Sequence, residues 1–534
     1  MFKKILKYGV IIFLIFIVFS AIGKNISKNE RTEDKTSYPE SSEKPVQYPT
    51  QSTGIIIGIE YAVEGQDASA FGKLGIPAIK PLPEAINWSK MQPKLDGPIN
   101  YDVADQFVRD YQNAGFRELI MGLRALSHAE DNKATYGKNR PVPKPEYENK
   151  YADWVKGFVE RYDGDGISDM PGLKYPIRYY EIEVEFSSYT PEPVDEYLKK
   201  LEIAYKAAHE AYPDVLIAHS AFLALTAFDS NPLANQYEKA FASMYIPDKH
   251  HNLTDMRKVL DRPELFDRLN FHELGDPLMI ERTVRWLKYE TDRRGYSKPI
   301  IISDTSPSPF VSYGRATGCT GLFLGITIWP AKESDRCRVA DYFNKILDND
   351  AATVAWKNWF IAGDMVKKTI IAAASGVELI DTAFTGDLPI LSTRLGFAGA
   401  GNGGFAGVVS EKYNIFTKKY SVTEYRPAFF ALRQLALKLA GTRSIVREQS
   451  DDDVRLYKLE NSSGKFWIGW IHPDYLVLPG DPDPNKSVSL NLPSGAKVIS
   501  MATAETAEDV SVIDSINGKV SINLTMTPVY IFKQ

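Results

Sequence analysis

Residues Tyr179 to Phe186 read Tyr-Tyr-Glu-Ile-Glu-Val-Glu-Phe, and the fold of the chain is organised around this stretch. Three carboxylates alternate with apolar side chains. On a β-strand this period of two predicts the carboxylates on one face and the apolar residues on the other. Buried charges need partners or shifted pKa values, so a buried strand keeps carboxylates most readily where they do chemistry. An exposed edge strand with an acidic outer face is the alternative.

Short apolar runs alternate with helix-like segments on both sides of this stretch. We expect eight strands, at residues 54–59, 76–80, 119–123, 179–186, 215–219, 269–272, 300–304 and 377–381. Helical spacing is present at residues 101–115, 151–162, 194–212, 280–291 and 353–374. Apolar strands that alternate with helices predict a parallel sheet covered on both faces. Eight such units fit a closed (β/α)8 TIM barrel, with its site at the C-terminal strand ends.

An open doubly wound sheet is the alternative fold for this region. No glycine-rich phosphate loop follows the first apolar run, so a nucleotide-binding version of that fold is not favoured. From about Ile445 onward the apolar period changes to two, which predicts antiparallel strands. We therefore divide the folded body into a barrel of residues 54–440, with a last helix from Pro427 to Leu439, and a small antiparallel β-sandwich of residues 441–534.

The N-terminus predicts export. Three lysines precede an apolar run from Tyr8 to about Ile22, which is short for a spanning helix and typical of a signal-peptide core. Residues 1–23 are thus a signal peptide or, if cleavage does not occur, an N-terminal membrane anchor. Residues 24–53 are rich in Ser, Pro, Glu, Lys and Thr and predict a disordered linker. Either alternative predicts an extracytoplasmic body, secreted or tethered to the membrane.

Composition narrows the partners of the chain. A net charge of -5 provides no basic field for a polyanion, which argues against nucleic acid. Cys319 and Cys337 are the only cysteines, and in an exported chain they form a disulfide or remain two thiols. The segment from Asp163 to Asp169 has oxygen ligands at alternating positions, as calcium loops do. It lacks the glutamate at the twelfth position, so a solvated turn is favoured and no metal is expected.

Several blocks, taken in order, resemble the large clan of retaining (β/α)8-barrel glycoside hydrolases that includes β-xylosidases and cellulases. The similar blocks are Asn87 to Pro93 after strand two, Tyr180 to Glu185 at the end of strand four, Phe266 to His272 on strand six, and Lys298 to Asp304 on strand seven. The C-terminal segment, ending Thr527-Pro528-Val529-Tyr530-Ile531, resembles the accessory domain of such enzymes. The likeness covers about residues 54–534.

The resemblance implies an exported O-glycoside hydrolase that cleaves a poly- or oligosaccharide with two carboxylates and no cofactor. Glu185 corresponds to the general acid/base, and Asp304 stands where the family has a nucleophilic glutamate. Val184 replaces the family's asparagine. The shorter Asp304 side chain withdraws its carboxylate by roughly 1.5 Å. Asp304 is therefore a nucleophile on a shifted backbone, the base of an inverting reaction, or a residue without a catalytic role.

The candidate residues each have a structural alternative. Glu185 is otherwise a salt-bridged rim carboxylate, and Asp304 otherwise caps the turn that follows it. His272 is interpreted as a substrate or carboxylate contact, or as a core histidine. Glu183 would raise the pKa of a neighbouring carboxylate. The expected substrate contacts, some of which are equally explained by structural pairing, are Glu183, His272, Lys80, Arg124, Tyr245 and Trp329.

Two other functions remain open at this point. One is a barrel that binds carbohydrate without cleaving it, which the changes at Val184 and Asp304 favour. The other is a structural module of the cell envelope.

Overall fold

The computed structural model describes residues 54–82, 86–125, 142–187, 190–244, 250–305, 319, 333–387, 406–448, 453–462, 464–506 and 508–534. The predicted signal peptide or anchor, the predicted linker up to residue 53, Tyr245 and Trp329 lie outside this set. Within it, no helix combines the length and the apolar character needed to cross a bilayer.

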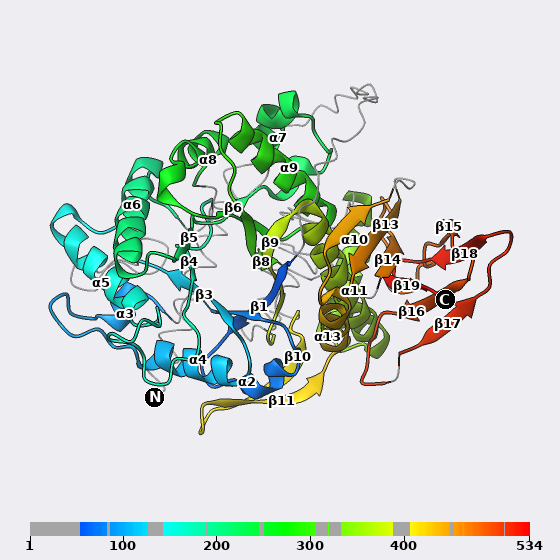
Figure 1. Ribbon diagram of the computed structural model, residues 1–534, viewed down its shortest axis with the longest axis horizontal. Helices are drawn as coiled ribbons and strands as arrows, with labels where there is room; N and C mark the ends of the chain where they lie inside the picture. The colour runs from blue at the N-terminus through cyan, green and yellow to red at the C-terminus, as the bar shows by residue number, and fades with distance from the viewer. Residues whose placement is uncertain are drawn as a thin grey trace. The chain divides into compact units, whose positions relative to one another are not determined.

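A parallel sheet forms the centre of the N-terminal region (Figure 1). Its nine strands follow the order β5-β4-β3-β2-β1-β9-β8-β7-β6. The strands are β1 (Ile56–Ala62), β2 (Ala78–Pro81), β3 (Glu118–Leu123), β4 (Tyr179–Ile182), β5 (Leu216–Ala218), β6 (Phe222–Leu223), β7 (Leu269–Glu273), β8 (Ile300–Thr305) and β9 (Val377–Phe384). Each of the eight predicted strands matches one of these positions, because long apolar runs between helices specify buried parallel strands.

Strands β5 and β6 are two parts of the fifth barrel strand, separated by a short break. Strand β5 pairs with β4 through Tyr179 and Leu216, whereas β6 pairs with β7 through Phe222 and Phe271. Isolated parallel bridges from Glu185 to Ala221 and from Ala218 to Arg268 continue the pairing across the break. The sheet thus occupies eight positions and closes on itself, as the sequence predicts.

Helices surround the parallel strands (Figure 1). They include α2 (Ala68–Gly72), α3 (Trp88–Met91), α4 (Asp102–Asn113), α5 (Glu148–Glu160), α6 (Val194–Ala211), α7 (Tyr237–Ser243), α8 (Leu253–Leu260), α9 (Leu278–Asp292), α10 (Arg336–Leu347), α11 (Ala351–Ser375) and α13 (Pro427–Leu439). Local signals set their ends. In α11, the Asp350 side chain accepts a hydrogen bond from the Thr353 N–H, and Gly376 ends the helix in the left-handed region at a φ of 81°.

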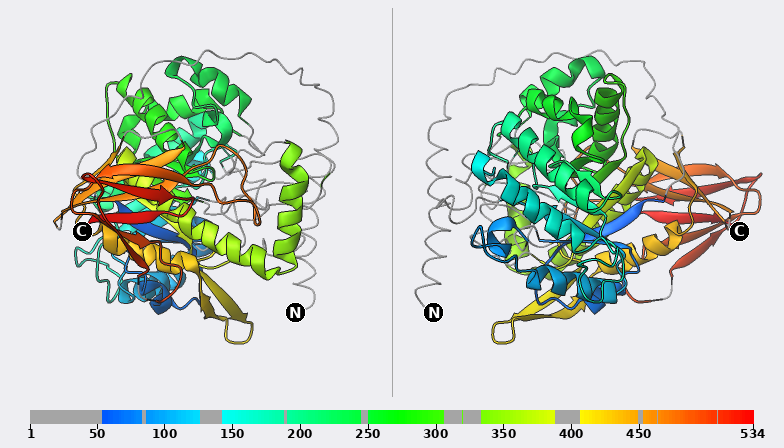
Figure 2. Two further views of the ribbon diagram at one scale, coloured as in Figure 1. Left: turned by 90° about the vertical axis from the view of Figure 1, so that its right-hand side faces the viewer. Right: turned by 60° about the vertical axis from the view of Figure 1, so that its left-hand side comes forward.

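Strands β10 (Val409–Asn414) and β11 (Lys419–Tyr425) form a hairpin, which lies between β9 and α13 in the sequence. It extends outward from the neighbouring elements in both views of Figure 2. After α13, six antiparallel strands follow the order β12-β13-β14-β19-β16-β17, and β15 pairs with β18 in a second sheet. Their bounds are β12 (Ser444–Arg447), β13 (Val454–Asn461), β14 (Gly464–Ile471), β15 (Lys486–Asn491), β16 (Ala496–Ser500), β17 (Val510–Ile513), β18 (Lys519–Leu524) and β19 (Val529–Lys533).

The two C-terminal sheets share one apolar core. Leu456 and Ile531 of the larger sheet belong to the same buried cluster as Leu490 and Ile522 of the smaller one. This is the antiparallel arrangement that the change to period two predicts. The expected boundary near residue 440 falls between α13 and β12. Cys319 and Cys337 are bonded to each other.

The predicted alternation along residues 179–186 is wrong at one position. Strand β4 ends at Ile182, and Glu183 adopts a φ of 67°, in the left-handed region that non-glycine residues seldom occupy. One such residue turns the chain and breaks the period of two. The carboxylates of Glu181, Glu183 and Glu185 therefore do not share one face, as their different partners below show.

Candidate active site

Glu185 and Asp304 meet at the C-terminal ends of two barrel strands. Glu185 lies three residues beyond β4 and bridges to Ala221, and Asp304 is the penultimate residue of β8. The exposed fraction of Glu185 is 8% and that of Asp304 is 5%, so each carboxylate is nearly enclosed. One oxygen of Glu185, one oxygen of Asp304 and one nitrogen of His272 all lie within 4.8 Å of one another. The two predicted catalytic residues are thus brought together.

His272 lies between these two carboxylates. Its Nδ1 atom is 3.0 Å from Glu185 Oε1 and 3.9 Å from Asp304 Oδ2. Its Nε2 atom is 3.0 Å from Ser303 Oγ. Burial alone would lower the pKa of His272, but hydrogen bonds to Glu181 and Glu185 and the charge of Asp304 outweigh it and raise that pKa to about 9. His272 is therefore a cation at neutral pH, and both of its ring nitrogens donate hydrogen bonds.

The carboxylate of Asp304 has one donor that the sequence did not indicate. Tyr61, on β1, donates its hydroxyl hydrogen to Asp304 Oδ2 at 2.9 Å. Tyr61 adopts a φ of 62°, and its ring packs edge-on against Phe384 at a centroid distance of 4.4 Å. The other oxygen, Asp304 Oδ1, is buried, and Asp304 also shares a side-chain hydrogen bond with the carboxyl group of Glu60.

Lys80 and Glu181 form a buried ion pair beside His272. Lys80 Nζ lies 2.8 Å from Glu181 Oε2 and donates to the Ser303 carbonyl oxygen at 2.8 Å. Glu181 also accepts hydrogen bonds from Asn270 and Ser303. Burial raises the pKa of Glu181, but the Lys80 ammonium and His272 outweigh it and lower that pKa to about 2. Lys80 therefore holds a carboxylate, one of the two alternatives that the sequence left open for it.

Two further buried carboxyl groups lie near Asp304. Glu60, on β1, accepts a hydrogen bond from the Thr305 N–H, and burial together with the charge of Asp304 raises its pKa well above the ordinary value. Asp381, on β9, is fully buried, and neither of its carboxyl oxygens has a hydrogen-bond partner among the described residues. Burial also raises its pKa. A Cβ atom on Gly58 would lie 2.1 Å from Asp381 Oδ1, so only glycine leaves room for this carboxyl group.

Glu183 has a different set of partners from its two neighbours. Its Oε1 atom accepts hydrogen bonds from Lys200 Nζ of α6 and from the Ala125 N–H, both at 2.9 Å. Its Oε2 atom lies 3.7 Å from Arg124 Nε. Lys200 also contacts Glu192 at 2.6 Å. Glu183 and Arg124 thus contribute to a buried ionic cluster that ties β4 to α6, and their predicted substrate contacts remain predictions.

Some residues of the site were not predicted, and for one of them the sequence does contain a signal. Glu181 stands in the same acidic run as Glu185, at the position where strand alternation does hold. Nothing comparable marks Tyr61, Glu60 or Asp381, because their importance depends on neighbours that come from distant strands.

The acidic turn near residue 165 is organised by its own backbone. Asp169 accepts hydrogen bonds from the Gly164 and Gly166 N–H groups, and Asp163 accepts one from Asp165. The carboxylates of Asp163, Asp165 and Asp169 lie within 4.8 Å of one another. Three carboxylates at this spacing could also hold a metal ion, so the solvated turn without metal stays a prediction.

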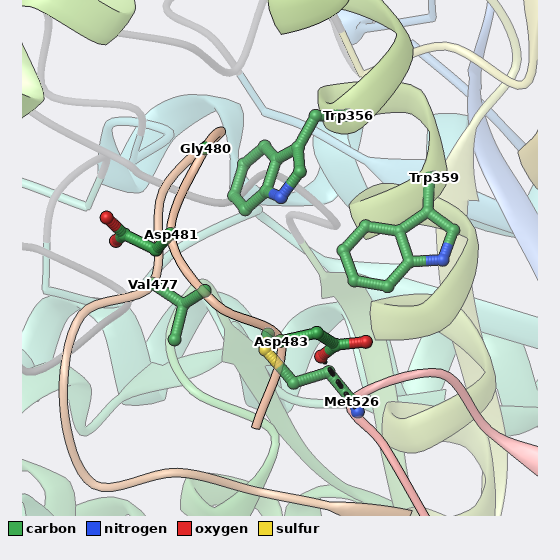
Figure 3. Close-up of a pocket in the computed structure, with 7 residues that line it drawn as sticks. All are labelled: Trp356, Trp359, Val477, Gly480, Asp481, Asp483 and Met526. Atoms are coloured by element: carbon green, nitrogen blue, oxygen red, sulfur yellow. Dashed lines mark hydrogen bonds between the residues drawn. The ribbon is translucent and has the colours of Figure 1, made fainter. Parts of the chain in front are cut away.

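A separate pocket of about 210 Å³ lies between α11 and the C-terminal region (Figure 3). Trp356 and Trp359 extend from α11 toward the loop that carries Val477, Asp481 and Asp483. Trp359 Nε1 donates a hydrogen bond to Thr527 Oγ1 at 3.1 Å. The lining residues differ from Glu185, Asp304 and the residues that contact them.

Two solved structures with a similar fold are a glycoside hydrolase and a glucosidase. One is a family 39 glycoside hydrolase from the gut symbiont Bacteroides cellulosilyticus WH2, with a TM-score of 0.55 and 12% sequence identity over 90% of this chain and 81% of that one. Another is a glucosidase from Croceicoccus marinus, with a TM-score of 0.51 and 11% identity over 90% of this chain and 95% of that one. No protein-family model matches the sequence, and no curated protein matches it significantly. At such identities the likeness concerns the fold: the chain has the fold of the (β/α)8-barrel glycoside hydrolases, followed by antiparallel C-terminal sheets.

Proposed function

We propose that the protein is a retaining glycoside hydrolase in which Glu185 is the general acid/base and Asp304 is the nucleophile. The observation that carries this proposal is the distance of at most 4.8 Å between an oxygen of Glu185 and an oxygen of Asp304. Retaining enzymes hold their carboxyl groups about 5–5.5 Å apart, whereas inverting enzymes hold them about 6.5–9.5 Å apart. The short separation of these two oxygens supports the retaining alternative for Asp304, although aspartate is shorter than glutamate.

In the first step, Asp304 attacks the anomeric carbon as the glycosidic bond breaks. Glu185 transfers its proton to the departing oxygen, and a covalent ester forms between Asp304 and the sugar. Asp304 attacks through its carboxylate, which Tyr61 orients by donating a hydrogen bond to Oδ2. The positive charge of His272, whose pKa is raised to about 9, lies 3.9 Å from Asp304 Oδ2 and helps to hold this carboxylate in place.

In the second step, Glu185 acts as a base. It removes a proton from a water molecule, whose oxygen attacks the anomeric carbon and displaces Asp304. Two inversions at one carbon give a product with the anomeric configuration of the substrate. Lys80 and Glu181 support the site by holding Ser303 and His272.

The substrate of this proposal is a poly- or oligosaccharide. The barrel fold shared with glycoside hydrolases and the paired carboxylates support a carbohydrate. The lysines and apolar run at the N-terminus support a location outside the cytoplasm, by secretion or by attachment to the membrane.

The test begins with the full chain and a broad panel of plant, microbial and host glycans. Reducing sugar released by the parent, and lost in Glu185→Gln and Asp304→Asn, is the expected result. Glu183→Gln is the matched control, since its carboxylate contacts Lys200 rather than the catalytic pair. Binding of glycan by the parent and by the Glu185→Gln and Asp304→Asn variants, without product from any of them, would instead identify a non-catalytic carbohydrate-binding barrel.

The stereochemistry is tested on any substrate that the parent cleaves. NMR of the first-formed anomer should show retention of configuration. An activated 2-fluoro glycoside should trap the ester, which mass spectrometry would locate on the peptide that contains Asp304. An inverted product would contradict the nucleophilic role and would make Asp304 the base of a single displacement.

A further inference from the structure

The tip of the β10–β11 hairpin exposes apolar side chains to solvent. The exposed fraction is 91% for Phe416, 69% for Ile415 and 44% for Tyr413. Phe416 has the largest exposed fraction of any large apolar residue in the described chain. Adjacent exposed phenylalanine and isoleucine side chains at a protruding tip indicate a surface that becomes covered by an apolar phase or a partner.

The tip is held in one conformation by hydrogen bonds of its own. Asn414 Oδ1 accepts from the N–H groups of Phe416 and Thr417, at 2.9 and 3.2 Å. The Lys418 N–H donates to the Asn414 carbonyl oxygen at 2.8 Å. Behind the turn, Tyr413 packs against Tyr420 at a centroid distance of 4.8 Å. Because the turn is already ordered, presenting Phe416 to a binding phase costs little conformational entropy.

One side of the hairpin, from Glu411 to the turn at Lys418, is docked on the loop that follows β1. The Tyr420 N–H donates to the Gly65 carbonyl oxygen at 2.8 Å, and Gln66 Nε2 donates to Glu411 Oε2 at 2.7 Å. Gly65 has a φ of 88°, and a Cβ atom there would lie 2.2 Å from the Lys418 carbonyl oxygen. The Val408 N–H, just before the hairpin, donates to the carbonyl oxygen of Phe384, the last residue of β9. Together with the contact to Gly65, this places the hairpin beside the C-terminal ends of β1 and β9. This is the end of the barrel that carries Glu185 and Asp304.

The residues of the tip itself carry positive charge, whereas Glu411 and the exposed Glu64 and Asp67 lie next to the tip. Residues 412–419 contain three lysines, at positions 412, 418 and 419, and no acidic residue. All three lysines are exposed. The chain as a whole has a net charge of -5, so the positive tip is a local feature. Apolar side chains at a tip with lysines behind them match the interface of an anionic bilayer, where the rings enter the acyl boundary and the ammonium groups meet the headgroups.

We propose that the hairpin tip, Lys412 to Lys419, inserts Ile415 and Phe416 into the surface of an anionic lipid membrane. Contact through this hairpin brings the end of the barrel that carries the catalytic pair close to the bilayer. It would add a second, weaker attachment to any contact made by the predicted N-terminal apolar segment. The proposal concerns a surface and does not depend on the proposed hydrolase activity.

The test places a fluorophore at the tip of the full chain. In Phe416→Cys, an environment-sensitive NBD label attaches to the new thiol, since Cys319 and Cys337 are bonded to each other. The matched control is Leu437→Cys on α13, where the parent side chain is also exposed, at 72%. Vesicles of phosphatidylglycerol and phosphatidylcholine should raise and blue-shift the emission of the label at position 416 and leave the label at position 437 unchanged.

The same label then tests whether the lysines of the tip contribute to binding and whether the tip prefers lipid to polysaccharide. Replacing Lys412, Lys418 and Lys419 by glutamine should weaken partitioning by about fivefold for each lysine, and added salt should weaken it in the parent. Both proteins keep the N-terminal segment, so that segment cannot account for the difference. If vesicles leave the emission of the label at position 416 unchanged, or change it equally at positions 416 and 437, the proposal is overturned. A response to soluble anionic polysaccharide but not to vesicles would also overturn it and assign the tip to glycan.

Discussion

The hydroxyl group of Tyr61 donates a 2.9 Å hydrogen bond to Asp304 across 243 positions of the chain. It joins the end of β1 to the end of β8 and fixes one oxygen of the proposed nucleophile. We expect Tyr61→Phe to lower kcat by about 10–100-fold, because a hydrogen bond to a charged group contributes about 1.5–3 kcal/mol. Steady-state kinetics on a cleaved substrate would measure this loss. Tyr413→Phe, a change on the exposed hairpin, should leave kcat unchanged, and equal kcat values in both variants would contradict the role of Tyr61.

The pH dependence should report His272. Its pKa of about 9 lies above the ordinary value of 6.5 because hydrogen bonds to Glu181 and Glu185 and the charge of Asp304 outweigh burial. A raised folded-state pKa stabilises the fold fully below the ordinary pKa, and this contribution is lost as the pH rises toward 9. We expect the free energy of unfolding to fall by about 3 kcal/mol between about pH 6.5 and pH 9 through this group. Urea unfolding at several pH values would measure the decline.

The same titration should reduce activity. When His272 loses its proton, it no longer provides positive charge beside Asp304, so kcat should fall as the pH passes about 9. His272→Gln should have low kcat throughout and should lack this alkaline limb. An alkaline limb that persists in His272→Gln would assign it to another group.

Lys80 and Glu181 should show strong energetic coupling. Lys80→Met leaves the Glu181 carboxylate buried without its cation, which typically costs about 3–5 kcal/mol. In the double variant Lys80→Met with Glu181→Gln, the buried charge is gone, so the free energy of unfolding should recover in part. Urea unfolding of both single variants and the double variant would give the coupling energy. Additive losses would show that the ion pair has no special importance.

Glu183 and Glu185 should separate stability from catalysis. Glu183→Gln weakens the contact with Lys200 of α6 and should lower the free energy of unfolding by about 1–3 kcal/mol while preserving kcat. Glu185→Gln removes the proposed proton donor and should lower kcat by about 10²–10⁴-fold. Circular dichroism melting and kinetics on both variants provide the comparison. Loss of kcat in a folded Glu183→Gln variant would show that Glu183 acts on the substrate after all.

We expect Asp381 to lower the free energy of unfolding relative to an asparagine at the same position. Burial raises its pKa well above the ordinary value of 3.8, so the folded protein holds a proton that the unfolded chain releases. Stability therefore falls as the pH rises above that ordinary value, by about 1.4 kcal/mol per pH unit while the proton is held. Asp381→Asn removes this cost, and its advantage over the parent should grow with pH. Urea unfolding would measure it, and a variant less stable than the parent at every pH would mean that Asp381 is ionised beside Lys80.

Local patterns of sequence determined most of the architecture. The eight apolar runs predicted all eight strand positions of the barrel, because a parallel strand covered by helices must be apolar on both faces. The helix Pro427–Leu439 has the predicted bounds, since proline at its first turn and a clear apolar face are local signals. Placing Glu185 and Asp304 at C-terminal strand ends followed from counting strands, and the structure brings the two residues together.

Tertiary structure decided what each carboxylate contacts. Glu183 adopts a left-handed backbone conformation, and its side chain contacts Lys200. Two residues later, the side chain of Glu185 contacts His272. An alternation with a period of two does not predict this change of direction. The partners of Asp304 come from β1 and β7, far away in the chain. Periodicity reports only which side of an element is buried. Hydrogen bonds and shifted pKa values depend on which side chains from other elements fill the same volume, and closure of the barrel sets that.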